Sequence, residues 1–252
     1  MNSVVAGLVK KNERIAGNVY EMIIGTNICD DYVPGQFINI YLDDKSMLLP
    51  RPISICNGVA GSVSIVYRVV GKGTLCLSRY SQNQTILHSS PLGNGYTIQE
   101  NLAGIKVAVV GGGIGIPPLV GLTRALRKRG AEVRPFLGYN SEIFLADKFE
   151  SPNISTEDGR YGHTGNAVEM VRNRGQIFDE YYACGPKAML KALYEHTAEV
   201  GRNVQVSVEE RMGCGYGACV GCSCNTIENG EIVKKSVCKH GPVFLGKELV
   251  WD

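Results

Sequence analysis

Four cysteines near the C-terminus have types and spacing that suit a metal centre. Cys214, Cys219 and Cys222 lie in one short run, and Cys238 follows in a separate segment. This C-x4-C-x2-C…C spacing is that of a plant-type 2Fe-2S cluster. Three thiolates from one tightly wound loop and a fourth from elsewhere in the chain can converge on two irons. The spacing therefore predicts one-electron transfer.

Glycines are interleaved with these cysteines at positions 213, 215, 217 and 221. Glycine adopts positive φ at little steric cost, so we expect this loop to take such conformations and to turn its backbone N–H groups toward the cluster sulfurs. Cys224 is also close in sequence. We expect it to be a bystander, because using it in place of Cys222 would lose the x2 spacing.

Zinc is the main alternative on the cysteines alone, because four thiolates also satisfy a tetrahedral zinc ion. Structural zinc sites usually show two separate C-x2-C pairs, whereas only Cys219 and Cys222 form one here. A disulfide framework is disfavoured, since the nine cysteines are odd in number and we expect no signal peptide. A reduced, cytoplasmic, metal-binding protein fits best, with Cys29, Cys56 and Cys76 as small buried hydrophobes.

Composition restricts the remaining possibilities. The chain has 252 residues, of which 44% are hydrophobic and 20% charged, which suffices for two ordinary domains with their own cores. Its apolar stretches are interrupted well before the length of a membrane span. The net charge of +2 provides no general field for nucleic acid. We therefore expect neither a membrane nor a nucleic-acid partner.

The first part of the chain, residues 1–99, has the pattern of a small antiparallel β-barrel. Short runs at 19–24, 37–42 and 62–70 are rich in β-branched and aromatic residues, and Gly, Pro, Asn and Asp separate them. Regular short strands of this kind are typical of a barrel.

Residues 100–208 change to alternating strands and helices, which predicts a doubly wound parallel α/β domain with both faces of the sheet covered. The remaining segment, 209–252, carries the four spaced cysteines and too little apolar sequence to fold alone, so we expect it to depend on its metal. The expected strands are 106–110, 132–137, 181–183 and 204–208, and the expected helices are 117–129 and 186–200.

Two glycine turns of the α/β part are candidates for nucleotide binding. The strand at 106–110 leads into a run containing Gly111, Gly112, Gly113 and Gly115, then into a helix, so backbone donors and a helix N-terminus face one point. A second strand ends at Cys184-Gly185-Pro186 and opens another helix. Both turns are expected at one crevice, beyond the carboxyl ends of the strands. The alternatives are a plain tight turn for the first and simple packing for Cys184.

Within the barrel part, an arginine, hydroxyls and a glycine turn are spaced along neighbouring strands. Arg51-Pro-Ile-Ser54 follows one strand, and Gly71-Lys-Gly-Thr74 follows Val66-Tyr-Arg68. Charge-assisted donors and close backbone approach are what a flavin diphosphate requires. Taken alone, this composition is a weak signal.

Taken in order, these segments resemble the ferredoxin reductase family, in which a barrel binds FAD and an α/β domain binds NAD(P)H. Pro34-Gly-Gln-Phe37 and Pro91-Leu-Gly-Asn-Gly95 belong to the same pattern. The run Glu209 to Cys222 and the late Cys-Lys-His-Gly-Pro-Val-Phe244 further resemble the electron-transfer subunits of two-subunit, NAD-dependent dihydroorotate dehydrogenases. The resemblance covers essentially the whole chain. One departure is His240, where this family more often has aspartate.

The resemblance implies roles for individual residues. Cys214, Cys219, Cys222 and Cys238 would hold the cluster, Gly73 and Thr74 would approach the FAD phosphates, and the glycine turns with Cys184, Gly185 and Pro186 would bind NAD(H). The other implied FAD contacts are Arg51, Pro52, Ile53, Ser54, Val66, Tyr67 and Arg68.

The resemblance also implies a division of labour with a partner. An FMN-containing catalytic subunit would oxidise dihydroorotate in pyrimidine biosynthesis, in a heterotetramer with two copies of each chain. This chain would carry electrons from that subunit to NAD⁺ and would contain no catalytic residue and no dihydroorotate site. His88, His163, His196 and His240 are scattered in the sequence, and ordinary packing or surface roles are expected for them.

Two rival functions stay open at this point. One is a related flavin and iron-sulfur subunit with another partner, of the NADH-dependent ferredoxin:NADP⁺ reductase, sulfide dehydrogenase or hydrogenase type. The other is a zinc-stabilised nucleotide-binding module with no redox role. The preference for NAD over NADP is not determined by the sequence, since Glu132 and Arg134 lie close together near the second strand.

Overall fold

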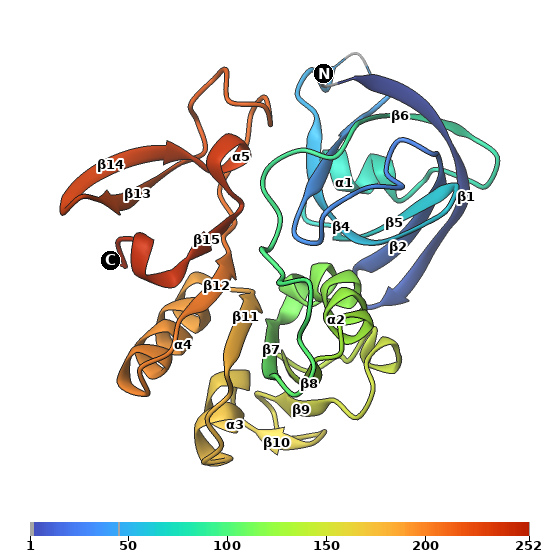
Figure 1. The fold of residues 1–252 in the computed structure, drawn as a ribbon. Helices are drawn as coiled ribbons and strands as arrows, with labels where there is room; N and C mark the ends of the chain where they lie inside the picture. Colours follow the sequence, from blue (N-terminus) through green and yellow to red (C-terminus); the bar gives the residue numbers. More distant parts are fainter. Residues whose placement is uncertain (1–2, 45, 252) are drawn as a thin grey trace.

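Short, β-branched strands in the first hundred residues pair into a closed barrel (Figure 1). The computed structural model describes residues 3–44 and 46–251. The order around the barrel is β1-β2-β5-β4-β3-β6, and the helix α1, Lys72–Leu77, follows β5. Ile24, Ile38, Ile55 and Ile65 fill its interior without solvent exposure. The barrel strands are β1 (Val4–Ala16), β2 (Val19–Gly25), β3 (Phe37–Tyr41), β4 (Arg51–Val59), β5 (Ser62–Arg68) and β6 (Thr85–Ser89).

The next part of the chain forms a seven-stranded sheet in the order β10-β9-β8-β7-β11-β12-β15. All neighbouring pairs are parallel except β12 with β15, which is an antiparallel edge strand from the C-terminal segment. Its strands are β7 (Lys106–Gly112), β8 (Glu132–Tyr139), β9 (Asn153–Thr156), β10 (His163–Thr164), β11 (Glu180–Cys184), β12 (Val204–Ser207) and β15 (Val243–Leu245).

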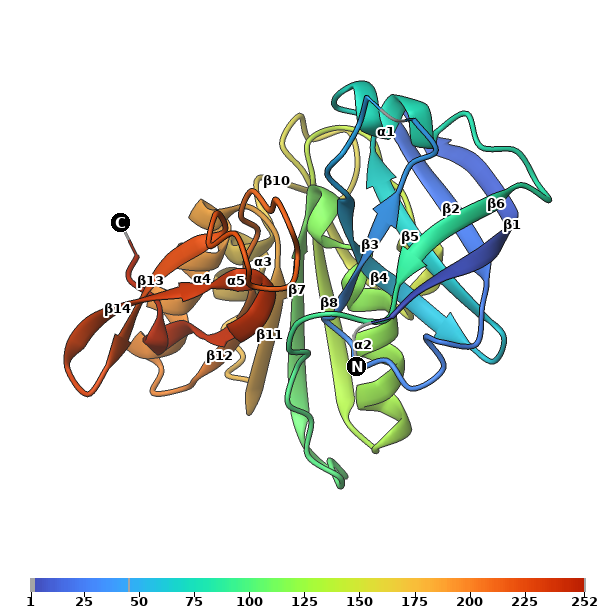
Figure 2. The ribbon, with the colours of Figure 1, turned by 90° about the horizontal axis from the view of Figure 1, so that it is seen from above.

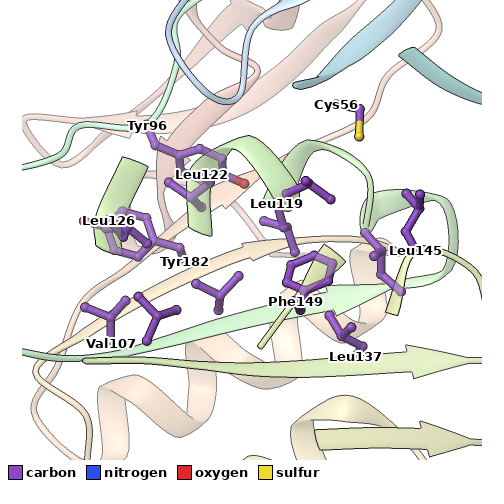
Figure 3. Packing of buried hydrophobic residues seen from close by; sticks show 14 of the residues in the cluster. Cys56, Tyr96, Val107, Leu119, Leu122, Leu126, Leu137, Leu145, Phe149 and Tyr182 are labelled. Atoms are coloured by element: carbon purple, nitrogen blue, oxygen red, sulfur yellow. The ribbon is translucent and has the colours of Figure 1, made fainter. Parts of the chain in front are cut away.

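Helices cover both faces of this sheet, as its continuous apolar strands require. On one face, α2 (Pro118–Lys128) places Leu119, Leu122 and Leu126 on the strands, and Cys56 of the barrel joins the same core (Figure 3). On the other face lie α3 (Ala167–Asn173) and α4 (Lys187–Glu199). Short 3-10 turns occur at Gly113–Gly115, Ala146–Lys148 and Gly246–Glu248.

The C-terminal segment is small and packs beside the sheet, on the side away from most of the barrel (Figures 1 and 2). A hairpin of β13 (Ser223–Glu228) and β14 (Glu231–Ser236) leads into the single turn α5 (Val237–His240). Asn229 and Gly230 have positive φ, as the two central residues of a tight hairpin turn commonly do.

The predicted fold class is confirmed: an antiparallel barrel, a doubly wound sheet and a small C-terminal segment follow one another. Each predicted strand and helix is present within a few residues of its expected ends. The antiparallel strand β15 was not foreseen. It ties the C-terminal segment into the sheet, and the three-domain division at residues 99 and 208 stays a prediction. None of the helices in the described residues is long and apolar enough to cross a bilayer.

Candidate cofactor and metal sites

The hairpin explains how a distant cysteine reaches the cysteine loop. Ser223 at the start of β13 pairs with Ser236 at the end of β14, so the residues just outside this pair are neighbours. The Val237 N–H donates to the Cys222 carbonyl at 2.9 Å. Cys238 follows directly, and its N–H donates to the Cys222 sulfur at 3.4 Å.

The predicted ligands are linked as two pairs. The N–H groups of Tyr216 and Cys219 donate to the Cys214 sulfur at 3.5 and 3.4 Å, and the Cys214 N–H donates to the Cys219 sulfur at 3.5 Å. Cys222 and Cys238 form the second pair, and both are buried. Cys219 is exposed, so the loop presents one pair toward solvent and holds the other inside.

Backbone hydrogen bonds prepare one of these thiols to be a ligand. Burial raises the pKa of Cys214, but hydrogen bonds from the N–H groups of Tyr216, Cys219 and Ala218 outweigh it and lower the pKa to about 6. Burial, together with a hydrogen bond to Cys222, raises the pKa of Cys238 to about 12. A Cβ on Gly217 would lie 3.0 Å from the Lys239 side chain, so the loop of the first pair packs beside the residue that follows Cys238. N–H groups directed at sulfur stabilise thiolate and its metal-bound form.

The donor set fits a two-iron cluster better than a single zinc ion. Four thiols in two pairs match two irons, each with two protein ligands. Within residues 3–44 and 46–251, the cysteine, histidine and carboxylate side chains form no group of three close enough to hold a metal ion, so the thiols stand as two separate pairs. Burial raises the pKa of Cys224. Its role as a bystander stays a prediction.

The expectation that the glycines of the cysteine loop adopt positive φ holds for two of the four. Gly215 and Gly217 have φ of +79° and +90°, whereas Gly213 and Gly221 are not among the positive-φ residues, and Val220 adopts φ +48° instead. At Gly213 the reason for glycine is space, because a Cβ there would lie 3.2 Å from the Cys219 sulfur. The loop therefore uses some glycines for conformation and others to leave room for the thiols.

In the barrel, the start of β4 and the end of β5 lie at the same end of the antiparallel pair, which brings Arg51 to the turn after β5. A Cβ on Gly73 would overlap the Arg51 guanidinium. Arg68 extends toward the first glycine turn, its Nη2 3.9 Å from a Cβ placed on Gly113, and its buried Nε has no partner among the described residues. Two cations, one with an unused buried donor, fit the diphosphate of a dinucleotide.

Some of the barrel residues predicted to contact FAD have side chains that are buried in the protein core. Ile53 and Tyr67 belong to the barrel core, where the Tyr67 hydroxyl donates to Asn12 at 2.8 Å, so they have only main-chain groups for a ligand. Val66 is buried where the barrel meets the sheet. The Thr74 hydroxyl accepts from the N–H groups of Val70 and Gly71 at 3.0 and 3.2 Å, and thereby fixes the turn that contains Gly73. Pro52 and Ser54 are half-buried.

The two glycine turns of the sheet interlock, as the sequence predicts. β7 and β11 are parallel neighbours with Gly111 opposite Cys184. A Cβ on Gly115 would lie 2.5 Å from the Cys184 carbonyl carbon, and one on Gly112 would lie 2.9 Å from Pro186. Glycine is therefore needed for the turns to meet. Burial raises the pKa of Cys184 to about 12, so its thiol is neutral where β11 meets the first glycine turn.

Sequence reasoning missed two asparagines that connect the barrel to the cysteine segments. The Asn39 amide on β3 donates to the Cys214 carbonyl at 2.8 Å, and the Asn94 amide donates to the His240 carbonyl at 3.0 Å. Asn94 lies in the predicted Pro-Leu-Gly-Asn-Gly motif, which offered a signal, whereas nothing in the sequence near Asn39 did. His240 is exposed, and its Nδ1 lies 3.3 Å from the Ser236 carbonyl oxygen.

A barrel, a nucleotide-type sheet and a four-thiol segment in this arrangement define an electron-transfer protein of the ferredoxin reductase type. A solved structure described as an NADH-dependent reduced ferredoxin-NADP oxidoreductase, in work on flavin-based electron bifurcation, is similar with a TM-score of 0.86 and 29% identity. The match covers 98% of this chain and 90% of the other.

Curated relatives identify the family more closely. The dihydroorotate dehydrogenase B (NAD(+)) electron transfer subunits of Bacillus caldolyticus and of Geobacillus kaustophilus are each 38% identical to this chain, and the matches cover 96% of both partners. Residues 209–250 match the iron-sulfur cluster binding domain of dihydroorotate dehydrogenase B. The chain belongs to the family of dihydroorotate dehydrogenase B electron transfer subunits, as the resemblance implied.

Proposed function

We propose that this chain transfers electrons between NAD(H) and a separate catalytic subunit that oxidises dihydroorotate, through FAD and a 2Fe-2S cluster. The observation that carries the proposal is the pairing of Cys214 with Cys219 and of Cys222 with Cys238, next to a barrel with cationic side chains at one end. When bound, a flavin accepts a hydride and passes electrons on singly, which matches a nicotinamide to a one-electron cluster.

The residues of the chain would provide binding and position. Arg51, Gly73 and Arg68 would hold the FAD diphosphate, and the Thr74 hydroxyl would keep the turn in place. The same proposal assigns main-chain or packing contacts with FAD to Pro52, Ile53, Ser54, Val66 and Tyr67. Gly111, Gly112, Gly113 and Gly115 would let NAD(H) approach the crevice, beside Cys184, Gly185 and Pro186. The four paired thiols would hold the cluster.

The exposure of one thiol pair supports a proposal for where electrons leave the chain. Cys219 is exposed, and the neighbouring Tyr216 and Val220 are 55% and 65% exposed. An apolar surface beside an exposed ligand suits docking of the catalytic subunit. We propose that this subunit contains FMN, that the assembly holds two copies of each chain, and that it works in the cytoplasm in pyrimidine biosynthesis.

The test is to assay the chain alone and with its partner. Alone, it should reduce an artificial dye with NADH and should not oxidise dihydroorotate. Addition of the catalytic subunit should couple dihydroorotate oxidation to NAD⁺ reduction. Dihydroorotate oxidation by the isolated, FMN-free chain would contradict the proposal.

The similarity to the NADH-dependent ferredoxin-NADP oxidoreductase keeps a second function worth testing, because the match covers almost the whole chain. Purification of the tagged chain from its native cells separates the two. A dihydroorotate-oxidising flavoprotein as partner supports the proposal, whereas a larger NADP-dependent flavoprotein would support the second function.

A further inference from the structure

Asn39 is a fully buried polar residue that joins the barrel to the cysteine loop. Its side-chain Nδ2 donates to the carbonyl of Cys214 at 2.8 Å. Its own backbone N–H donates to the Ser89 hydroxyl at 2.9 Å, which fixes this part of β3 against β6. A rigid barrel strand thus holds the main chain of one proposed cluster ligand.

The alternation of β3 explains why Asn39 faces the cysteine loop. Its neighbours Ile38 and Ile40 point into the barrel core, so Asn39 points outward. Its cross-strand partner is Pro52, in the middle of the Arg51 to Ser54 segment proposed to bind the flavin. Side chains of paired residues lie on the same face of a sheet. Asn39 therefore contacts the loop of Cys214 from directly beside the flavin segment.

The contact between Asn39 and the cysteine loop is close. A Cβ on Gly215 would lie 2.5 Å from both amide atoms of Asn39, so the loop glycine packs directly against this side chain. The Asn39 Oδ1 is buried and has no hydrogen-bond partner among the described residues. An apolar residue of the same shape would remove this unpaired oxygen but would leave the Cys214 carbonyl without its donor. The bond to Cys214 is therefore what the asparagine amide contributes here.

A second contact on the same side serves the other cysteine pair. The Asn94 amide donates to the carbonyl of His240, two residues after Cys238, but Asn94 is exposed whereas Asn39 is buried. Strand β3 thus contacts the Cys214 half of the thiol site, and the segment after β6 contacts the Cys238 half, but only the first of these contacts comes from a buried side chain.

We propose that Asn39 is a positioning residue for electron transfer, which fixes the Cys214 half of the cluster loop against the flavin strand. This inference rests on the proposed function. It predicts that loss of the Asn39 amide loosens the loop and slows the flow of electrons from flavin to cluster, while reduction of the flavin by NADH is unaffected.

The experiment compares Asn39→Leu and Asn39→Ser with Asn153→Leu, the same substitution at a half-buried asparagine elsewhere in the sheet. Asn153 also donates its amide to a backbone carbonyl, that of Pro135 at 3.0 Å, but lies on β9 far along the sheet. Two quantities are measured on the loaded proteins. One is the rate of iron release to a chelator, and the other is the rate of cluster bleaching relative to flavin bleaching after rapid mixing with NADH.

Asn39→Leu should release iron about tenfold faster, which corresponds to the loss of one hydrogen bond to the half-buried Cys214 carbonyl. Its cluster should bleach more slowly than in the wild type, with flavin bleaching unchanged. Asn39→Ser has a shorter polar side chain, so its rates of iron release and cluster bleaching should lie between those of Asn39→Leu and the wild type. Asn153→Leu should have wild-type rates. Loss of the cluster with retention of flavin in both Asn39 variants would also support the proposal.

If the fully loaded Asn39 variants released iron and bleached their cluster at wild-type rates, the proposed positioning role of Asn39 would be overturned. Equal changes in Asn153→Leu would overturn it as well, because the effect would then be general destabilisation. A wild-type chain that holds no flavin or no iron would instead contradict the proposed function, so the two failures are distinguishable.

Discussion

The flavin barrel and the cysteine segment build their sites in opposite ways. The barrel closes on itself around a core of buried isoleucines, and its cationic residues stand on strands that this core holds rigid. The cysteine segment has an exposed two-stranded hairpin and a few buried residues that pack against the sheet. We therefore expect the barrel site to keep its shape without its cofactor, and the cysteine site to depend on its metal and on contacts with neighbouring elements.

The largest expected effect follows from removing a buried cysteine of the cysteine site, which we expect to depend on its metal. Cys222→Ser should abolish nearly all cluster absorbance and lose the structure of the C-terminal segment, because Cys222 contacts Cys238 inside the segment. Flavin binding by the barrel should survive. Visible spectra and limited proteolysis measure both. Cys224→Ser is the control and should keep the cluster; loss of flavin together with the cluster would contradict the independence of the barrel.

A smaller effect is expected where the two regions meet. Gly215→Ala forces a side chain into φ +79° and against Asn39, whereas Gly230→Ala, at φ +85°, meets nothing within 4 Å. The strain of positive φ should cost each variant about 1–2 kcal/mol. Overlap with Asn39 should add about 1–3 kcal/mol for Gly215→Ala only.

Hydrogen exchange measures the free energy of opening at each site. Protection in the cysteine loop of Gly215→Ala should fall more than protection in the hairpin turn of Gly230→Ala. Equal losses at the two sites would mean that the Asn39 contact contributes nothing to the loop.

The barrel site should respond to a local change without loss of fold. Gly73→Ala places a methyl group where the Arg51 guanidinium lies, so the arginine has to move. We expect the Kd for FAD to rise about tenfold, roughly the contribution of one charge-assisted hydrogen bond. Gly71→Ala is the matched control, since its φ of −169° suits any residue and its surroundings are open. Flavin titration followed by fluorescence measures the Kd for FAD of both variants. Equal Kd values would contradict the assignment of Arg51 and Gly73 to the FAD site.

The smallest expected effect is a pH dependence within the barrel. His88 is fully buried, and burial lowers its pKa below the ordinary value of about 6.5. As the pH falls through 6.5, the unfolded chain binds a proton that the folded barrel excludes, so the free energy of unfolding decreases. His88→Leu should lack this component. Denaturant unfolding at pH 7 and pH 5.5 measures the loss of unfolding free energy between the two pH values. An equal loss in His88→Leu and in the wild type would assign the pH dependence to other groups.

The comparison of the two regions also shows what a sequence can predict. The four thiols were found because three of them lie within nine residues in an unmistakable spacing. The glycine turns were found because each strand, turn and helix is local. Asn39 escaped notice because its partner Cys214 is 175 residues away, and only the folded barrel brings them together.

Some features were mispredicted or overlooked for physical reasons. Positive φ was assigned to Gly213 and Gly221, although space around the thiols explains Gly213 and Val220 takes the strained conformation. The strands β9 and β10 are short and polar, so periodicity gives little signal for them. The hairpin that delivers Cys238 had a signal in Asn229-Gly230 between two strand-like runs, which was not used.

The central claim is that NADH reduces a 2Fe-2S cluster in this chain through bound FAD. Its most direct test is to reduce the purified wild-type chain with NADH in the absence of oxygen and to record electron paramagnetic resonance spectra. Flavin, iron and acid-labile sulfide are assayed on the same sample. The account predicts one FAD, two irons and two sulfides per chain, and the signal of a reduced 2Fe-2S cluster after NADH is added. A colourless chain containing one zinc ion, or a cluster that NADH does not reduce in the presence of bound flavin, would contradict it.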